Sequence, residues 1–418
     1  MFKEALTRII RLFLVLFIAW ISFFPEPIQN QYKIWVIYFL GVILILSLAR
    51  EQFGFKKYFF RPAAAFFFLY LLLLSLNIWF SKDHQASLNF YIDFVLRASL
   101  VFFVFKNETK LDGLKRIFYV LFICAGIVSF FGLLEMFFST NVLYKYFLQN
   151  PFYSRFIGKR IMSTLVHPNI LGAYLLVCIP LASYFYWHAQ TYKRRLLNLT
   201  VLCFIAAGAL LSFSRGTWIA GILMFSFWLW QKGKFKRILY IWLGFLTWSA
   251  LASLSLFGQG FARRFGIVRL FYYLRFSHRA KNYHVTWEML KEHPFVGIGL
   301  DCYRKFFGQY SNLRFSEEVK VPDSIYLMHL AETGLLGFLG LLLLLGYVLG
   351  RAWKIYKRLE TKEREFIFAV LLGFIGLIVN MASFDGFLWK TPFYLFWIFL
   401  AVLSAMGEIK QPTLSGEK

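Results

Sequence analysis

The chain has 418 residues, of which 59% are hydrophobic and only 16% are charged. The apolar residues fall into runs of about 16–22, long enough to cross a bilayer core, so the composition excludes an ordinary soluble domain. The net charge of +25 does not indicate a nucleic-acid partner. Much of it lies in short loops, where it orients the chain and meets anionic headgroups of membrane lipids.

The apolar runs predict about twelve spanning helices in a single all-α polytopic membrane domain covering residues 1–418. The connectors alternate between a strongly basic set and a set whose short members carry one positive charge each. Because basic loops stay in the cytoplasm, we expect both termini there and the second set on the outer face. The runs are 8–24, 34–49, 62–80, 88–105, 117–138, 170–187, 196–213, 216–230, 238–256, 326–349, 366–384 and 392–407, and the single outer charges are Lys33, Lys82, Arg215 and Lys390.

Two outer connectors are long, at 139–169 and at 257–325, and both carry several positive charges. Long loops cross the membrane largely regardless of charge, so the expected topology stands. In the larger loop, residues 278–292 contain no Pro or Gly and predict a helix, which Pro294 and the turn Gly297-Ile-Gly299 end. Without a preceding strand, this Gly-x-Gly does not indicate a dinucleotide fold. The apolar residues expected on or near one side of the helix are Val285, Trp287 and Met289.

Arg215 lies at an outer turn between two predicted spans, in Ser212-Phe213-Ser214-Arg215-Gly216. An arginine at a membrane boundary costs free energy unless it reaches the headgroups or finds a partner. It either snorkels to the headgroups or binds an anion at the start of the next helix. In the second case, Gly216 and the nearby serine hydroxyls would let a phosphate approach the backbone.

Asp323 lies where the larger loop returns to the membrane. Its carboxylate is either the N-cap of the next span or a general base for an incoming hydroxyl. His329 and Glu332, one or two turns deeper, are secondary candidates. His284 and Glu288 are four residues apart on the predicted loop helix, but no third ligand is apparent, so we expect no zinc site.

Four segments in order closely resemble the O-antigen ligase/polymerase superfamily, and the resemblance covers residues 160–337. The family's usual His-Asn before the Tyr-Leu pair reads Asp323-Ser324 here. The segments are Arg160-Ile-Met-Ser-Thr-Leu-Val-His167-Pro168-Asn169-Ile-Leu-Gly172, Ser214-Arg215-Gly216, Arg279 through Trp287 to His293-Pro294-Phe-Val-Gly297-Ile-Gly299, and Tyr326-Leu327 through Ala331-Glu332-Thr333-Gly334-Leu-Leu-Gly337.

The resemblance implies a GT-C-like glycosyltransferase on the periplasmic face of the bacterial inner membrane. Such proteins move a glycan from undecaprenyl pyrophosphate to lipid A–core, as ligases, or to a second lipid-linked glycan, as polymerases. By the family pattern, Arg215 and Arg279 bind the donor pyrophosphate, and the departure at Asp323 makes this carboxylate the candidate base. His167 alternatively shapes the start of the next span. The further candidates for binding the substrate are Arg160, His167 and Tyr326.

The resemblance also implies inversion at the anomeric carbon, with the base opposite the leaving group. Preorganised cations aimed at the growing charge on the pyrophosphate supply the largest catalytic term, and the planar fork of Arg suits phosphate oxygens. The outer side has no Asp-x-Asp, and the similarly spaced Glu363 and Glu365 lie on the predicted cytoplasmic side. We therefore expect arginines in place of a metal ion, and no cofactor.

Ligase is favoured narrowly over polymerase because both arginine motifs match, whereas the missing histidine favours polymerase. A transporter of lipid-linked saccharides is a lower alternative, since it is expected to carry charged residues deep in several spans. The plausible intramembrane charges here are Asp93, Arg97 and Glu135. Asp93 and Arg97 are four residues apart and can pair with each other.

Overall fold

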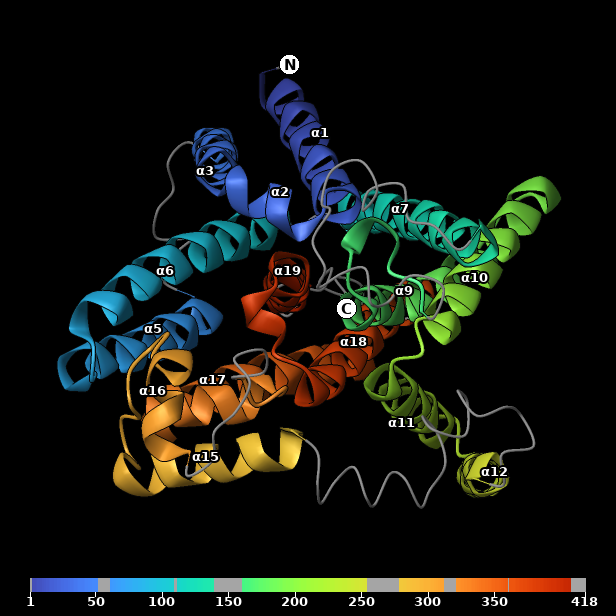
Figure 1. The fold of residues 1–418 in the computed structure, drawn as a ribbon. Helices are drawn as coiled ribbons and strands as arrows, with labels where there is room; N and C mark the ends of the chain where they lie inside the picture. Colours follow the sequence, from blue (N-terminus) through green and yellow to red (C-terminus); the bar gives the residue numbers. More distant parts are fainter. Residues whose placement is uncertain are drawn as a thin grey trace, which may run out of the picture.

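The structure is a computed structural model that describes residues 2–51, 61–108, 111–138, 160–253, 278–311, 321–359 and 361–406. All regular secondary structure within these ranges is helical (Figure 1). Nine of the helical segments described are long and apolar enough to cross a membrane, and α19 is a shorter apolar helix. The all-α polytopic class is confirmed, and the number of twelve crossings stays a prediction.

A helix is found at each of the twelve positions predicted to span the membrane. These helices are α1 (Phe2–Phe23), α3 (Lys33–Arg50), α5 (Pro62–Phe80), α6 (His84–Lys106), α7 (Leu111–Phe138), α9 (Pro168–Trp187), α10 (Tyr192–Leu211), α11 (Arg215–Gln231), α12 (Phe235–Ser253), α17 (Ile325–Arg358), α18 (Thr361–Asn380) and α19 (Lys390–Met406). The shorter elements are α2 (Glu26–Gln31), η2 (Ser163–Leu165), α15 (His278–Glu292), α16 (Tyr303–Tyr310), η3 (Met381–Ser383) and η4 (Gly386–Leu388).

Helix α19 lies at the centre of the bundle, and every residue from Lys390 to Met406 is buried. A helix that is apolar all round its circumference is buried either in lipid or among other helices, and here other helices enclose it. Figure 1 shows α1, α6, α17 and α18 around it. Trp397 contacts the rings of Phe67, Phe94 and Phe396. The connector between α18 and α19 is therefore held by a rigid core.

Helix α17 is broken at Gly334, whose φ of 63° and ψ of −167° are not helical. The loop that follows α15 fills this break, since four backbone hydrogen bonds of 2.8–3.1 Å join residues 294–299 to residues 331–336. A Cβ on Gly297 or on Gly334 would overlap the opposite backbone carbonyl. Two of the segments that carry the family resemblance are thus the two sides of one backbone pairing.

Asn77 of α5 fastens this pairing to the membrane helices. Its side-chain Nδ2 donates to the carbonyls of Val296 and Glu332, the latter at 2.6 Å, and its Oδ1 accepts from the N–H of Leu300 at 2.9 Å. Irregular backbone at membrane depth is tolerated where such partners satisfy it.

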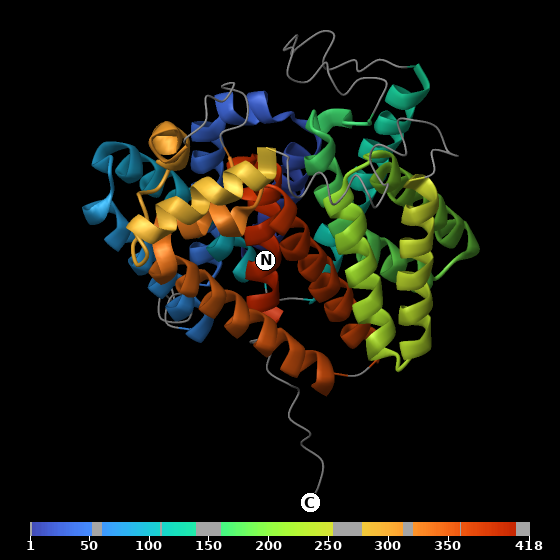
Figure 2. The same ribbon diagram turned by 60° about the horizontal axis from the view of Figure 1, so that its bottom comes forward.

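Helix α15 spans the residues predicted for it, His278–Glu292, and packs above α17 and α16. Val285 and Met289 are buried as expected, but the side chain of Trp287 is 55% exposed. The prediction for Trp287 is wrong because it lies two residues from Val285 and from Met289, and positions two apart on a helix do not share a face. Figure 2 shows α15 and α16 gathered at one end of the bundle.

Candidate functional site

Three helices begin at this end of the bundle, and each follows a residue in the left-handed conformation. Val166 (φ 51°), Phe213 (φ 46°) and Asp323 (φ 48°) lie two positions before the first residues of α9, α11 and α17. Residues with a Cβ rarely adopt this conformation, and it gathers at functional sites. The first N–H groups of a helix carry partial positive charge. The three starts therefore supply positive potential to the same end of the protein.

The end of α18 and the connector to α19 contact the three helix starts. From α18, the side chain of Asn380 donates to Thr217 Oγ1 in α11 at 3.0 Å. In α17, the hydroxyl of Tyr326 donates to the carbonyl of Ile378 at 2.6 Å. Before α9, the ring of His167 stacks on Trp389, with ring centroids 5.1 Å apart. These contacts define the candidate site at residues 378–389.

Arg215 is the first residue of α11 and is half-buried. A Cβ on the next residue, Gly216, would overlap Ser383 Oγ in the connector. Gly216 is therefore needed for helix packing, which differs from its expected role of letting a phosphate approach. Ser214 is the N-cap residue of α11. Arg215 thus combines a guanidinium group with a helix N-terminus, a combination suited to binding anions.

The charge of Asp323 acts on Asp385 at this site, and we call these two residues the carboxyl pair. Burial of Asp385, which is only 6% exposed, is the main cause that raises its pKa, and the charge of Asp323 adds to it, so that the pKa reaches about 6. The Trp389 side chain donates a hydrogen bond to Asp385, and Arg304 of α16 attracts it. The alternative in which Asp323 caps α17 is wrong, because Ser324 Oγ accepts from the N–H of Leu327.

The sequence reasoning missed Asp385. The one signal for it was an Asp-Gly pair at a predicted membrane boundary, at the outer end of the last two runs. A single acid there is indistinguishable from a solvated turn until its neighbours are known. The structure supplies those neighbours, since Asp323 and Trp389 both interact with Asp385.

Arg160 and His167 organise the backbone beside the site. Arg160 Nε donates to the carbonyl of Ser212 at 2.8 Å, and its Nη2 donates to Asn169 Oδ1 at 2.9 Å. His167 is the N-cap of α9, and its Nδ1 accepts from the N–H of Asn169 at 3.3 Å. The two residues bring α9 to the turn that precedes Arg215. That His167 shapes the start of the next span is thus confirmed, while a substrate contact by either residue stays a prediction.

His329 and Glu332 lie deeper in α17 and are buried. His329 Nε2 lies 3.3 Å from the hydroxyl of Tyr70 in α5. The carboxylate of Glu332 accepts from the N–H of Tyr303, at the start of α16, at 3.1 Å. These two side chains therefore join α17 to α5 and to α16.

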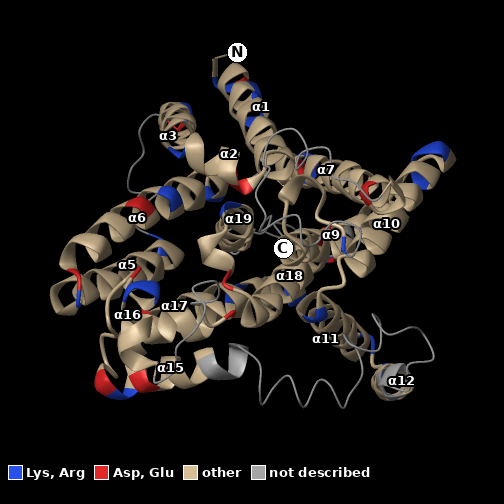
Figure 3. Ribbon diagram, in the orientation of Figure 1, with Lys and Arg blue, Asp and Glu red and all other residues tan. Residues whose placement is uncertain are grey.

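Arg279 lies in the first turn of α15, and its side chain is outside the described residues. On the same helix, His284 Nδ1 lies 3.8 Å from Glu288 Oε1, which also pairs with Lys291. No three His, Cys, Asp or Glu side chains come together among the residues that the structure describes. Figure 3 shows acidic and basic residues on α15 and α16 and near the ends of other helices.

The sequence model of the O-Antigen ligase family matches residues 199–342, from α10 to the second half of α17. No curated protein matches the chain. The matched region contains Arg215, Arg279 and Asp323. His167 and Asp385 lie outside it in the sequence and come close to it only in the folded chain. This match, together with the all-helical multi-pass architecture, supports a relationship to the O-antigen ligase superfamily.

Proposed function

We propose that the protein is an inverting glycosyltransferase that moves a glycan from undecaprenyl pyrophosphate to lipid A–core. The reaction takes place at the periplasmic face of the bacterial inner membrane, with both termini in the cytoplasm. The observation that supports this proposal is that the starts of α11 and α17, which carry Arg215 and follow Asp323, both contact residues 378–389, the segment that contains Asp385. A cation for the leaving group and an acid pair for the incoming hydroxyl are the two parts that such a transfer needs.

In the proposed reaction, the arginines stabilise the pyrophosphate leaving group of the donor. When the bond between the anomeric carbon and the phosphate oxygen breaks, its electron pair stays on the pyrophosphate. Arg215 and the N–H groups of α11 stabilise that charge, and Arg279 assists from the first turn of α15. These groups take the part that a divalent cation plays in other transferases, so the proposed reaction is metal-independent. Loss of one such preorganised donor slows a reaction by about 100–1,000-fold.

In the proposed reaction, the carboxyl pair accepts the proton of the acceptor hydroxyl. The acceptor hydroxyl gives its proton to a carboxylate as its oxygen bonds to the anomeric carbon from the face opposite the pyrophosphate. Interacting acids titrate as a unit, so we assign the base to Asp323 and Asp385 together. The raised pKa of Asp385, about 6, makes it a stronger base than an exposed aspartate while leaving it ionised at neutral pH.

Polymerase activity, with a second lipid-linked glycan as acceptor, is the alternative within the superfamily. A transporter has less support, because the intramembrane charges have structural partners. Asp93 pairs with Arg97 in α6. Glu135 of α7 accepts from the backbone N–H groups of Met162 and Ser163 at 3.0 and 2.7 Å.

Single substitutions to Ala at Arg215, Arg279, Asp323 and Asp385 test the proposal, with Arg194→Ala at the opposite end of the bundle as the control. We expect the two arginine variants to lose about 100–1,000-fold in transfer and the control to keep it. Full transfer by the Arg215 and Arg279 variants at normal expression would refute the mechanism.

The accumulated species separates the two activities. A ligase defect leaves long glycan on undecaprenyl pyrophosphate and bare lipid A–core, whereas a polymerase defect leaves single repeats. A chelator should not change the rate, and inhibition reversed by one divalent ion would contradict metal independence.

A further inference from the structure

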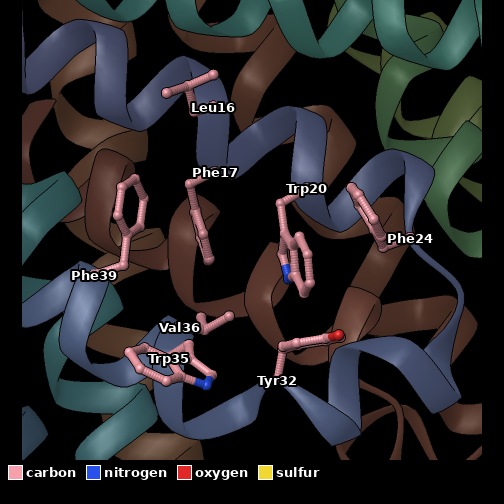
Figure 4. A pocket seen from close by; sticks show the side chains of 8 residues that line it. All are labelled: Leu16, Phe17, Trp20, Phe24, Tyr32, Trp35, Val36 and Phe39. Carbon is pink, nitrogen blue, oxygen red and sulfur yellow. The ribbon is translucent and has the colours of Figure 1, made fainter.

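A hollow of about 440 Å³ lies between α1 and α3 (Figure 4). This volume is within the range of small-molecule pockets. Aromatic side chains dominate its wall, and the ring of Trp20 stacks on Phe24 at 4.2 Å. Rigid rings provide a large apolar contact area at a low entropic cost. The lining residues are Leu16, Phe17, Trp20, Phe24, Tyr32, Trp35, Val36 and Phe39.

The hollow opens toward the lipid side of the bundle. Leu16 and Trp35 are 50% and 69% exposed on its rim, although α1 and α3 are both apolar enough to span the membrane. The surface around it continues as exposed apolar residues of the two helices, such as Leu12 and Val42. An occupant that enters from this side is therefore a hydrocarbon chain.

A cation stands at the rim of the hollow. Lys33 is exposed, directly follows the lining residue Tyr32, and is the first residue of α3. It makes no hydrogen bond or ion pair with the described part of the chain, and the N-terminus of α3 adds partial positive charge. An apolar hollow with a cation at its rim is complementary to a lipid whose headgroup carries phosphate.

The hollow adjoins the part of the site opposite to Arg215. Beside it on α1, the carbonyl of Ser22 accepts from Thr164 Oγ1 at 2.8 Å and that of Ile21 accepts from Thr391 Oγ1 at 2.9 Å. Thr164 lies three residues before His167, and Thr391 lies two residues after Trp389. Figure 1 shows α9 and α18 between α1 and α11, the helix that carries Arg215.

We propose that the hollow between α1 and α3, with Lys33 at its rim, binds the phosphate-bearing lipid anchor of the acceptor. This assignment rests on the proposed function, in which Arg215 holds the donor. The donor and the acceptor then approach the carboxyl pair from opposite sides of α9 and α18. Such an arrangement keeps the two lipid substrates from competing for one groove.

Substitutions that fill the hollow give the sharpest kinetic test. Leu16→Trp places a ring in the hollow, and Leu12→Trp places the same ring one turn away on an equally exposed position that does not line it. We expect Leu16→Trp and Lys33→Gln to raise the KM for lipid A–core about tenfold, which corresponds to about 1.4 kcal/mol. The KM for the polyprenyl donor and kcat should be unchanged. An unchanged acceptor KM, an equal effect of Leu12→Trp, or a raised donor KM would overturn the proposal.

A binding measurement separates this proposal from the proposed function. Native mass spectrometry of the full chain would be run with added lipid A–core and phosphatidylethanolamine. We expect the wild type and Leu12→Trp to retain lipid A–core and Leu16→Trp to lose it. Retention of phosphatidylethanolamine alone, or undiminished lipid A–core on Leu16→Trp, contradicts the inference. If the wild type bound lipid A–core without any transfer activity and Leu16→Trp did not bind it, the lipid-binding proposal would stand and the proposed transfer reaction would be rejected.

Discussion

Two irregular backbone segments reach the site, and a different side chain from a membrane helix holds each one. Residues 160–167 turn two N–H groups toward Glu135, whose Oε2 accepts both. Residues 293–300 present the carbonyl of Val296 and the N–H of Leu300, and the amide of Asn77 donates to the first and accepts from the second. Buried backbone groups must be paired. The type of helix residue that holds each loop therefore matches the N–H and carbonyl groups that the loop presents.

The largest effect is expected where the second segment enters the break in α17. Gly334→Ala puts a Cβ on a residue with a φ of 63° and against the backbone of Phe295. We expect a loss of about 3 kcal/mol or more in stability, measured as a lower thermal unfolding midpoint in detergent. Gly346→Ala in the same helix meets nothing within 4 Å and should unfold at or above the wild-type temperature. Equal midpoints for the two variants would contradict the backbone pairing.

Exchanging an oxygen for a nitrogen at the two holding residues sharpens the comparison. Asn77→Asp removes two donors and places a charge near two carbonyls, so it should destabilise the protein by about 3 kcal/mol. Glu135→Gln keeps an oxygen that can accept from both N–H groups, so it should cost about 1 kcal/mol. Both changes preserve the shape of the side chain. The thermal unfolding midpoints of the two variants show which change destabilises the protein more. The reverse order would show that charge, and not donor count, determines how these segments are held.

The smallest expected effects concern the pH dependence of transfer. Below a pH of about 6, Asp385 is protonated and cannot accept a proton, so kcat/KM should rise as the pH increases through that value. Asp323→Asn removes a charge that raises the pKa of Asp385, so the midpoint should move to lower pH. Trp389→Phe removes a hydrogen bond that lowers this pKa, so its midpoint should move to higher pH. If the two midpoints shifted in the same direction, or did not shift, Asp385 would not be part of the catalytic base.

Much of the helical framework could be predicted from the sequence, because membrane helices satisfy their own backbone hydrogen bonds and depend on local apolar runs. The runs located all twelve helices, and Pro294 and the glycines that follow it marked the end of α15 at Glu292. The family motifs also pointed to Arg215 and Asp323. These features depend on neighbours within one or two turns of the chain.

Only the tertiary structure decided which residues meet. Asp385 and Asn77 are single polar residues without a local sequence pattern. Asn77 donates hydrogen bonds to carbonyl groups more than 200 residues away in the sequence. Only the fold shows that the lack of a Cβ at Gly216 and at Gly334 allows Ser383 and Phe295 to pack against them. The sequence by itself determined the helices and placed Arg215 at the start of one of them. The carboxyl pair and the two held segments arise from contacts between distant parts of the chain, which no local pattern can report.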